Sequence, residues 1–159
     1  MAYNPLMVES PPPWPEEGID AVLEFLPEFE EPGFVAATWD PPLKSVIDGR
    51  EVTHMPYPTY TARFEEFWRT FLKTGGFIHP YNALPEDGDE AGIEFSVLGA
   101  HFTPDYIETA TLDQVRRCLS LFRRGEHFCD GYTESQFLNG SITAVLRRLK
   151  EIRNGGSSS

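Results

Sequence analysis

The chain has 159 residues, of which 40% are hydrophobic and 13% aromatic, and its formal net charge at neutral pH is -12. A chain of this length can bury one sizeable core. It contains no apolar run of about eighteen residues and no basic start followed by an apolar stretch, so we expect a single domain without a membrane span or a secretory signal. Its two cysteines, Cys118 and Cys129, are too few for a disulfide framework. We therefore expect reduced, structural thiols and a cytoplasmic protein.

The acidic charge is concentrated in the first two-thirds of the chain. Residues 1–100 carry 18 acidic and 5 basic side chains, whereas residues 101–159 carry 7 and 8. Repulsion from phosphates argues against nonspecific nucleic-acid binding. The last third could still form a local basic patch from six arginines: Arg116, Arg117, Arg123, Arg124, Arg147 and Arg148. We expect most of the acidic surface to be solvated rather than selected for a charged partner.

Residues 1–17 are rich in proline and include the sequence Pro11-Pro12-Pro13-Trp14-Pro15. Proline fixes φ and lacks an N–H donor, so these residues predict an extended arm. Trp14 either pins this arm to its own domain, the interpretation we favour, or presents it to a partner. The glycine and serine residues of 154–159 predict a flexible tail or a cloning remnant, which leaves 18–153 as the globular domain.

The sequence of the first half of the domain predicts two helices and, between them, either a hairpin or an ordered loop. Residues 18–26 predict a helix that Pro27 limits, and residues 34–39 are prone to β-structure. The segments 43–47 and 51–55, separated by Asp48-Gly49-Arg50, predict a hairpin or, almost equally, an ordered loop. Residues 59–74 predict the longest helix, ended by Gly75-Gly76. Its aromatic face indicates core rather than a stacking platform, and comprises Tyr60, Phe64, Phe67, Trp68, Phe71 and Leu72.

The second half predicts further helices after a short extended segment at 77–81, an acidic loop at 86–90 and a possible strand at 93–98. Thr103 followed by Pro104 predicts a short helix, and the Thr111/Gln114 spacing predicts a capping box that opens a helix ending at Gly125. A second box, Thr133/Gln136, predicts a helix closed by Gly140, and a final helix begins at Ser141. The sequence thus predicts a mainly α, compact single domain of about five helices, with at most one small β-hairpin. Six residues of the strongest stripes should be buried together: Phe67, Phe71, Leu119, Phe122, Val145 and Leu149.

The segment Arg124-Gly125-Glu126-His127-Phe128-Cys129-Asp130-Gly131, the 124–131 turn, allows two interpretations. In the structural one, which we favour, Arg124 or His127 donates to helix-end carbonyls, and Glu126 or Asp130 pairs with an arginine of the final helix such as Arg147. In the other, the turn is a ligand or partner site. A pocket would then be assembled from residues beside turns: Tyr57, His79, Tyr81, Arg124, Glu126 and His127.

No catalytic or metal-binding motif accompanies these residues, so the sequence predicts no catalytic residue, no metal and no cofactor. The four histidines, at 54, 79, 101 and 127, lack the close spacing that a helix needs to direct two of them at one metal. In an extended segment, His127 and Cys129 could share a face as base and thiol, but Asp130 would point away and no triad would form.

Several short segments carry a resemblance to a known family. They are Leu26-Pro27-x-Phe29-x-x-Pro32-Gly33-Phe34, Met55-Pro56-Tyr57, Gly76-Phe77-Ile78, the 124–131 turn, Gly140-x-Ile142 and Leu146-Arg147-Arg148-Leu149. In this order, from about Ile19 to Arg153, they resemble a bacterial family known as domain of unknown function 6508. The chain departs from that family at His127, where arginine is expected, and in lacking Asp-Trp after Ile78. The resemblance implies a compact, mostly helical bacterial domain and assigns no catalytic residue.

Two classes of function fit this sequence. The leading hypothesis is a non-enzymatic protein-interaction or regulatory module, such as a regulator or inhibitor of another bacterial or phage protein, with the acidic surface or the 124–131 turn as its contact. The alternative is a small-ligand-binding protein or enzyme with a pocket near Tyr57, His79, Tyr81 and the turn. A deep site joining those residues would favour the alternative.

Overall fold

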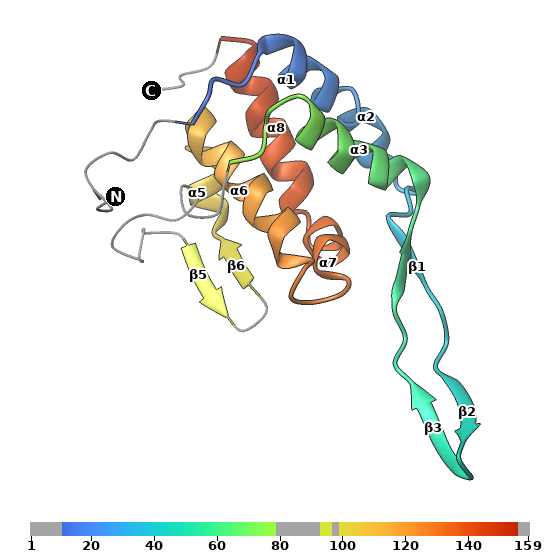
Figure 1. Cartoon of the computed structure of the whole chain (residues 1–159). Helices are drawn as coiled ribbons and strands as arrows, with labels where there is room; N and C mark the ends of the chain where they lie inside the picture. The colour runs from blue at the N-terminus through green and yellow to red at the C-terminus, as the bar shows by residue number, and fades with distance from the viewer. Residues whose placement is uncertain (1–10, 79–92, 97–98, 156–159) are drawn as a thin grey trace, which may run out of the picture.

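A computed structural model of the chain describes residues 11–78, 93–96 and 99–155 (Figure 1). The predicted acidic loop at 86–90 and most of the segment at 77–81 lie outside these residues. The helices are α1 (Glu16–Leu23), α2 (Leu26–Phe29), α3 (Ala62–Lys73), α5 (Pro104–Glu108), α6 (Leu112–Gly125), α7 (Tyr132–Leu138) and α8 (Ser141–Arg153). The strands are β1 (Ala37–Trp39), β2 (Leu43–Ile47), β3 (Arg50–His54), β4 (Pro58–Tyr60), β5 (Ile93–Ser96) and β6 (Gly99–Phe102). The prediction of a mainly α domain is confirmed. The described strands form three antiparallel pairs, β1–β4, β2–β3 and β5–β6, where at most one small hairpin was expected.

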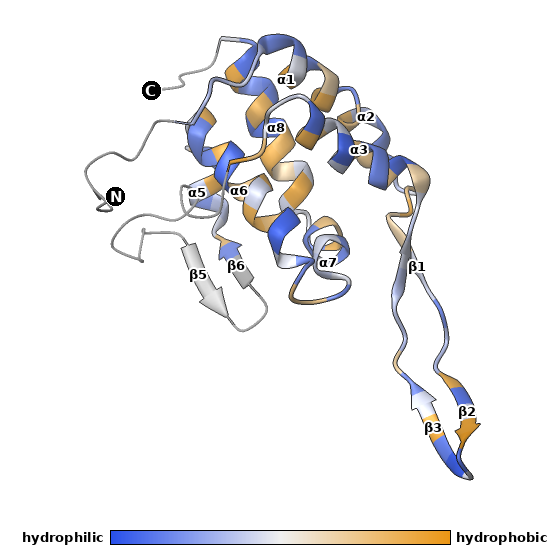
Figure 2. Ribbon diagram, viewed as in Figure 1, coloured by the Kyte–Doolittle hydropathy of each residue, from blue (hydrophilic) through white to orange (hydrophobic). Residues whose placement is uncertain are grey.

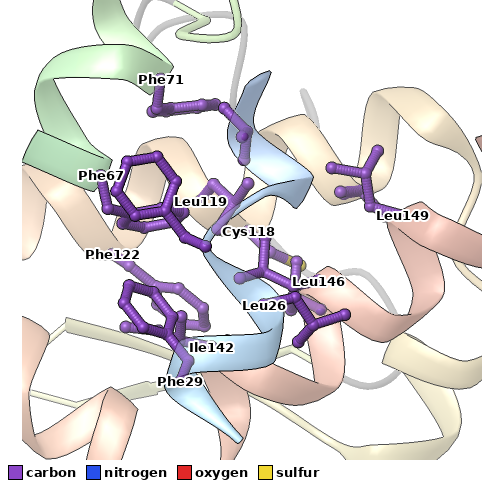
Figure 3. Packing of buried hydrophobic residues seen from close by; sticks show 14 of the residues in the cluster. Leu26, Phe29, Phe67, Phe71, Cys118, Leu119, Phe122, Ile142, Leu146 and Leu149 are labelled. Carbon is purple, nitrogen blue, oxygen red and sulfur yellow. The ribbon is translucent and has the colours of Figure 1, made fainter. Parts of the chain in front are cut away.

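The helices pack around α8, which contacts α1, α2, α5, α6 and α7. Its apolar stripe is fully buried, since Ile142, Val145, Leu146 and Leu149 have no exposed surface. Figure 3 shows this stripe meeting side chains of α2, α3 and α6 in one cluster. The six residues expected to be buried together are all in that cluster, which confirms the prediction.

The aromatic face of α3 is part of this core, as predicted. The Phe67 ring lies 5.1 Å from the Phe29 ring and 5.6 Å from the Phe25 ring, both in edge-on orientations that aromatic quadrupoles favour. Leu72 was expected on the same face but is 43% exposed. The face is therefore narrower than the sequence pattern indicated.

Local signals place some helix ends correctly and misplace others. The capping box of Thr111 and Gln114 and the Thr103 cap are both present. The predicted Thr133/Gln136 box is wrong, because α7 begins at Tyr132 after Gly131, whose φ of 86° is left-handed, and the Thr133 side chain bonds Glu126 instead. Pro27 lies in the first turn of α2 and does not end the helix before it. Proline is favoured there because a backbone N–H in the first turn has no acceptor within the helix, so its absence is not costly.

Residues 37–60 form a β-arm that leaves the helical body and ends in a two-residue turn (Figure 1). Asp48 and Gly49 both have positive φ, 52° and 74°, as a type I′ hairpin turn requires. The hairpin is confirmed over the loop alternative, with Ile47 opposite Arg50 at its tip. Prolines at 41, 42 and 56 lie between the two strand pairs of the arm, because proline cannot donate to a ladder, and Pro58 is the first residue of β4.

Trp14 ties the N-terminal segment to the body, as we favoured from the sequence. Its side chain is 5% exposed, its indole Nε1 donates to Thr74 Oγ1 at 3.3 Å, and its ring meets Phe71 edge-on at 5.6 Å. α1 begins at Glu16, two residues before the expected start. No helix in the described part of the chain has the length and apolar character needed to cross a membrane.

Candidate functional site

The 124–131 turn is organised by the carboxylate of Glu126. Its Oε1 accepts from the Tyr60 hydroxyl at 2.6 Å and from the Gly131 amide at 2.9 Å. Its Oε2 accepts from the Thr133 amide at 2.9 Å and from the Thr133 hydroxyl at 3.1 Å. A carboxylate has about four acceptor sites, so these four donors saturate it. Glu126 thus joins the turn, the start of α7 and the base of the β-arm.

A second contact fixes the arm at the same place. The indole Nε1 of Trp39, in β1, donates to Glu134 Oε1 at 2.6 Å. The Trp39 ring lies so close to Gly131 that a Cβ there would come within 2.4 Å of it. Gly131 is therefore required both for its left-handed φ and for the passage of this ring.

The turn makes structural contacts through Glu126, which act as a latch, but the partners expected from the sequence are wrong. Arg147 pairs with Glu30 at 3.5 Å and not with Glu126 or Asp130. Arg124 and His127 are exposed, and the Arg124 guanidinium lies 5.3 Å from the centre of the Phe128 ring. The latch acts between the turn and the arm because Tyr60, 66 residues earlier, supplies the donor that reaches Glu126.

The pocket expected from residues beside turns is not assembled in the described part of the chain. Tyr57 is 58% exposed on the arm, and Asp130 is exposed at the turn. Arg147 lies on α8 beside Glu30. His79 and Tyr81 lie outside the described residues. Of the predicted set, Arg147 lines two smaller hollows beside Glu151, and Glu126 lines a larger cavity with residues that the sequence did not put forward as a site.

That cavity has a volume of about 430 Å³ and lies between α3 and the end of α6. One wall comes from α3 and the other from the latch region; the lining residues are Glu65, Trp68, Arg69 and Leu72, then Tyr60, Arg123, Glu126 and Thr133. The indole Nε1 of Trp68 and the Nε of Arg123 are both buried without a hydrogen-bond partner within the described residues. Sequence reasoning missed this site because Trp68 followed the core stripe and Arg123 the solvated face, and no local motif joins them.

The six arginines do not form the local basic patch that the sequence allowed. Arg116 is only 2% exposed, and its guanidinium donates to the carbonyls of Gly75 and Gly76. Arg148 donates its Nε to the Ala110 carbonyl at 2.8 Å, and Arg147 pairs with Glu30. These arginines stabilise particular helix contacts instead of presenting one charged surface.

The geometry at His127 removes the base-and-thiol hypothesis. The segment is a hydrogen-bonded turn, in which the amides of Phe128 and Cys129 both donate to the Gly125 carbonyl, so the alternation of an extended strand does not apply. Cys118 is buried and Cys129 half-buried, and neither forms a disulfide. In the residues that the structure describes, no group of three or more His, Cys, Asp or Glu side chains is placed to hold a metal.

The β-arm is a second candidate surface because it exposes large apolar side chains. Leu43 is 64% exposed, Val46 73% and Ile47 52%, and Met55 near its middle is 81% exposed. Figure 2 shows hydrophobic colouring on β2 and β3 at the outer end of the arm, away from the helical body. An exposed apolar cluster of this kind marks an interaction surface more often than scattered single residues do.

The fold, the β-arm and the cavity describe a small, mainly α domain. Comparison with known proteins identifies the family of this domain. The model of one protein family, described as "Family of unknown function (DUF6508)", matches residues 14–155. The chain therefore belongs to this family, which agrees with the resemblance found from the sequence. Searches of the curated proteins and of the solved structures gave no significant match.

The phenol of Tyr60 should make stability fall at alkaline pH. Burial and the hydrogen bond to Glu126 raise the pKa of the Tyr60 hydroxyl far above its ordinary value. Above about pH 10 the unfolded chain loses a proton that the folded chain keeps, so the free energy of unfolding decreases as pH rises. Urea unfolding of wild type and Tyr60→Phe between about pH 9 and about pH 11 should give the steeper decrease in wild type. Burial raises the pKa of Tyr132 to about 12 and acts with the same sign, so the variant should keep part of the decrease. Equal slopes would contradict this origin.

Proposed function

We propose that this protein is a non-enzymatic protein-interaction module whose docking element is the tip of the β-arm, and that the arm binds a second copy of the chain. The observation that carries the proposal is an isolated two-stranded ribbon with exposed apolar side chains. Two strands alone are marginal in water, and a ribbon needs a third strand or a packed face for independent stability. A partner surface supplies that face.

One face of the ribbon is suited to this contact. Directly opposed residues of an antiparallel pair share a face, so Leu43, Ser45 and Ile47 lie on the same side as their partners His54, Val52 and Arg50. The Ser45 hydroxyl and the His54 Nε2 are hydrogen-bonded at 2.7 Å, which leaves Leu43, Ile47 and Val52 as its apolar contacts. The other face carries Val46 between polar residues, including the Lys44–Glu51 ion pair at 3.3 Å.

Charge and size favour a second copy as the occupant. The 24 residues of the arm carry three acidic and two basic side chains, while the whole chain carries -12. Two copies that meet at their arms therefore keep their acidic bodies apart, because the arm leads away from the body. A two-fold contact places the same apolar patch on both sides. A stable interface uses about 20–30 residues from each partner, which is the size of the 24-residue arm.

The charge and the thiols support the remaining features of the proposal. The acidic body repels nucleic acid and anionic membrane surfaces, so we expect the contacts of this module to be with protein. Neither Cys118 nor Cys129 forms a disulfide, as is usual in a reducing compartment such as the bacterial cytoplasm. A role in regulating another protein would use the assembled dimer.

Sedimentation equilibrium tests this proposal. The wild type should show a concentration-dependent dimer, and Leu43→Ser/Ile47→Ser should weaken dimerisation by roughly tenfold or more for each apolar side chain removed. Val46→Ser is the matched control, because Val46 is at least as exposed but lies on the opposite face of the same ribbon. It should leave the dimer nearly unchanged.

Circular dichroism of each variant checks that the helical body is retained, which we expect because the altered side chains are exposed. A wild type that sediments as a monomer at all concentrations would overturn the proposal. So would a dimer that the double variant leaves intact, or one that Val46→Ser disrupts equally.

A further inference from the structure

Two buried N–H donors at the cavity between α3 and α6 have no acceptor among the described residues. They are Trp68 Nε1, on a side chain that is only 6% exposed, and Arg123 Nε. A buried donor without a hydrogen-bond partner is unfavourable, and more so when the group is charged. Both side chains line the same cavity of about 430 Å³.

The other two described tryptophans show that this is a local feature. Trp14 donates to Thr74 at 3.3 Å and Trp39 donates to Glu134 at 2.6 Å. Glu126, one of the two carboxylates in the lining, does not accept from either donor, because four other hydrogen bonds already occupy its acceptor sites. An acceptor that enters the cavity from outside the chain would satisfy these donors once small side-chain movements open them, because both nitrogen atoms are closed to solvent as the chain stands.

The lining limits the chemistry of that acceptor. Arg69 and Arg123 supply two positive charges, and Glu65 and Glu126 supply two negative ones, so the lining is neutral overall. A multiply charged phosphate would face two carboxylates without a net positive field to hold it, whereas a single carboxylate needs only the arginine and the indole donor. Tyr60, Trp68 and Leu72 provide apolar surface beside those donors.

We infer that the cavity binds a small monocarboxylate with an apolar body. The carboxylate oxygens accept from the Trp68 indole and the Arg123 guanidinium, and the apolar body lies against the ring and aliphatic surfaces of the lining. The volume is within the range of small-molecule sites. This inference is independent of the β-arm, since none of the lining residues lies at the arm's tip.

Indole N–H signals in a ¹H–¹⁵N NMR spectrum report on this site directly. The chain has three tryptophans, so the spectrum contains three indole signals, and the one missing from Trp68→Phe is assigned to Trp68. Titration with phenylacetate should move the Trp68 signal in a saturable manner as its N–H gains an acceptor. The signals of Trp14 and Trp39 should stay, because their hydrogen bonds lie elsewhere.

Two comparison probes separate carboxylate recognition from other causes. The neutral 2-phenylethanol offers the same ring without the charge, and inorganic phosphate offers an anion without the ring. Each should move the Trp68 signal far less than phenylacetate at equal concentration. Equal effects of the alcohol would overturn the role of the carboxylate, and binding of phosphate in preference to phenylacetate would overturn the ligand class.

Arg123→Gln should weaken phenylacetate binding by about tenfold or more, because a hydrogen bond to a charged group is lost. Arg124→Gln is the matched control, since Arg124 is the next residue of α6 but lies exposed beside Phe128. Unshifted Trp14 and Trp39 signals in each variant verify the fold. An unmoved Trp68 signal in wild type, or equal affinity in Arg123→Gln and wild type, would overturn the inference.

Discussion

Arg116→Ala should lower the free energy of unfolding by about 3–4 kcal/mol, the largest effect that we expect from any single polar side chain. Arg116 is 2% exposed, and its Nε donates to the Gly76 carbonyl at 3.1 Å while a terminal nitrogen donates to the Gly75 carbonyl at 3.0 Å. These carbonyls follow the end of α3, where a helix leaves acceptors unpaired and its dipole favours a positive charge. Alanine removes both donors and leaves a cavity.

Urea unfolding monitored by circular dichroism measures this loss, with Arg124→Ala as the control on the same helix. Burial lowers the pKa of Arg116, which indicates that removing the charge from water is unfavourable. The guanidinium nevertheless stays protonated at neutral pH. Arg116→Lys should recover only part of the stability, because a single ammonium group cannot reproduce the bidentate hydrogen bonding to the Gly75 and Gly76 carbonyls. A change below about 0.5 kcal/mol in Arg116→Ala would mean that water replaces the guanidinium at both carbonyls.

The burial of Arg116 illustrates what could not be predicted from the sequence. Helical periodicity set Arg116 outside the apolar stripe of α6, and an arginine outside such a stripe is normally solvated. Its acceptors lie 40 and 41 residues earlier, just after α3. Only the packing of α3 on α6 brings them together, and no local pattern contains that information.

Features with local causes were predicted well. The capping box at Thr111, the proline start after Thr103 and the stripe of α8 depend on residues within a few positions of one another. The Asp48-Gly49 turn was predicted for the same reason, since both residues accept positive φ. The exposure of the hairpin was not predicted. Leu43 and Ile47 follow the alternation of a strand that buries one face, yet both side chains are exposed.

The cavity was beyond sequence reasoning for a related reason. Of its residues, only Glu126 was proposed from the sequence as part of a site, because it lies in a turn rich in charge. Trp68 followed the period of the buried aromatic face, and a periodic pattern does not tell whether an indole N–H finds an acceptor. That question depends on which chain segments surround it, and here they come from α3, β4 and α6.

Glu126→Gln should destabilise the protein by about 2–3 kcal/mol. The carboxylate accepts from Tyr60, from Gly131 and twice from Thr133, whereas an amide has one oxygen to accept with and an NH₂ group that would face a donor. Thermal and urea unfolding both measure the loss. We expect the base of the arm to loosen first, because Tyr60 then lacks its acceptor.

Double-mutant cycles identify the partner of this latch. Tyr60→Phe combined with Glu126→Gln should be non-additive, since each substitution removes the same 2.6 Å hydrogen bond. Arg147→Gln combined with Glu126→Gln should be additive, because Arg147 pairs with Glu30 and not with Glu126. Coupling of Glu126 to Arg147 rather than to Tyr60 would restore the arrangement expected from the sequence. It would also mean that the 124–131 turn does not hold the base of the β-arm. Tyr60 and Glu126 would then not be joined in the wall of the cavity.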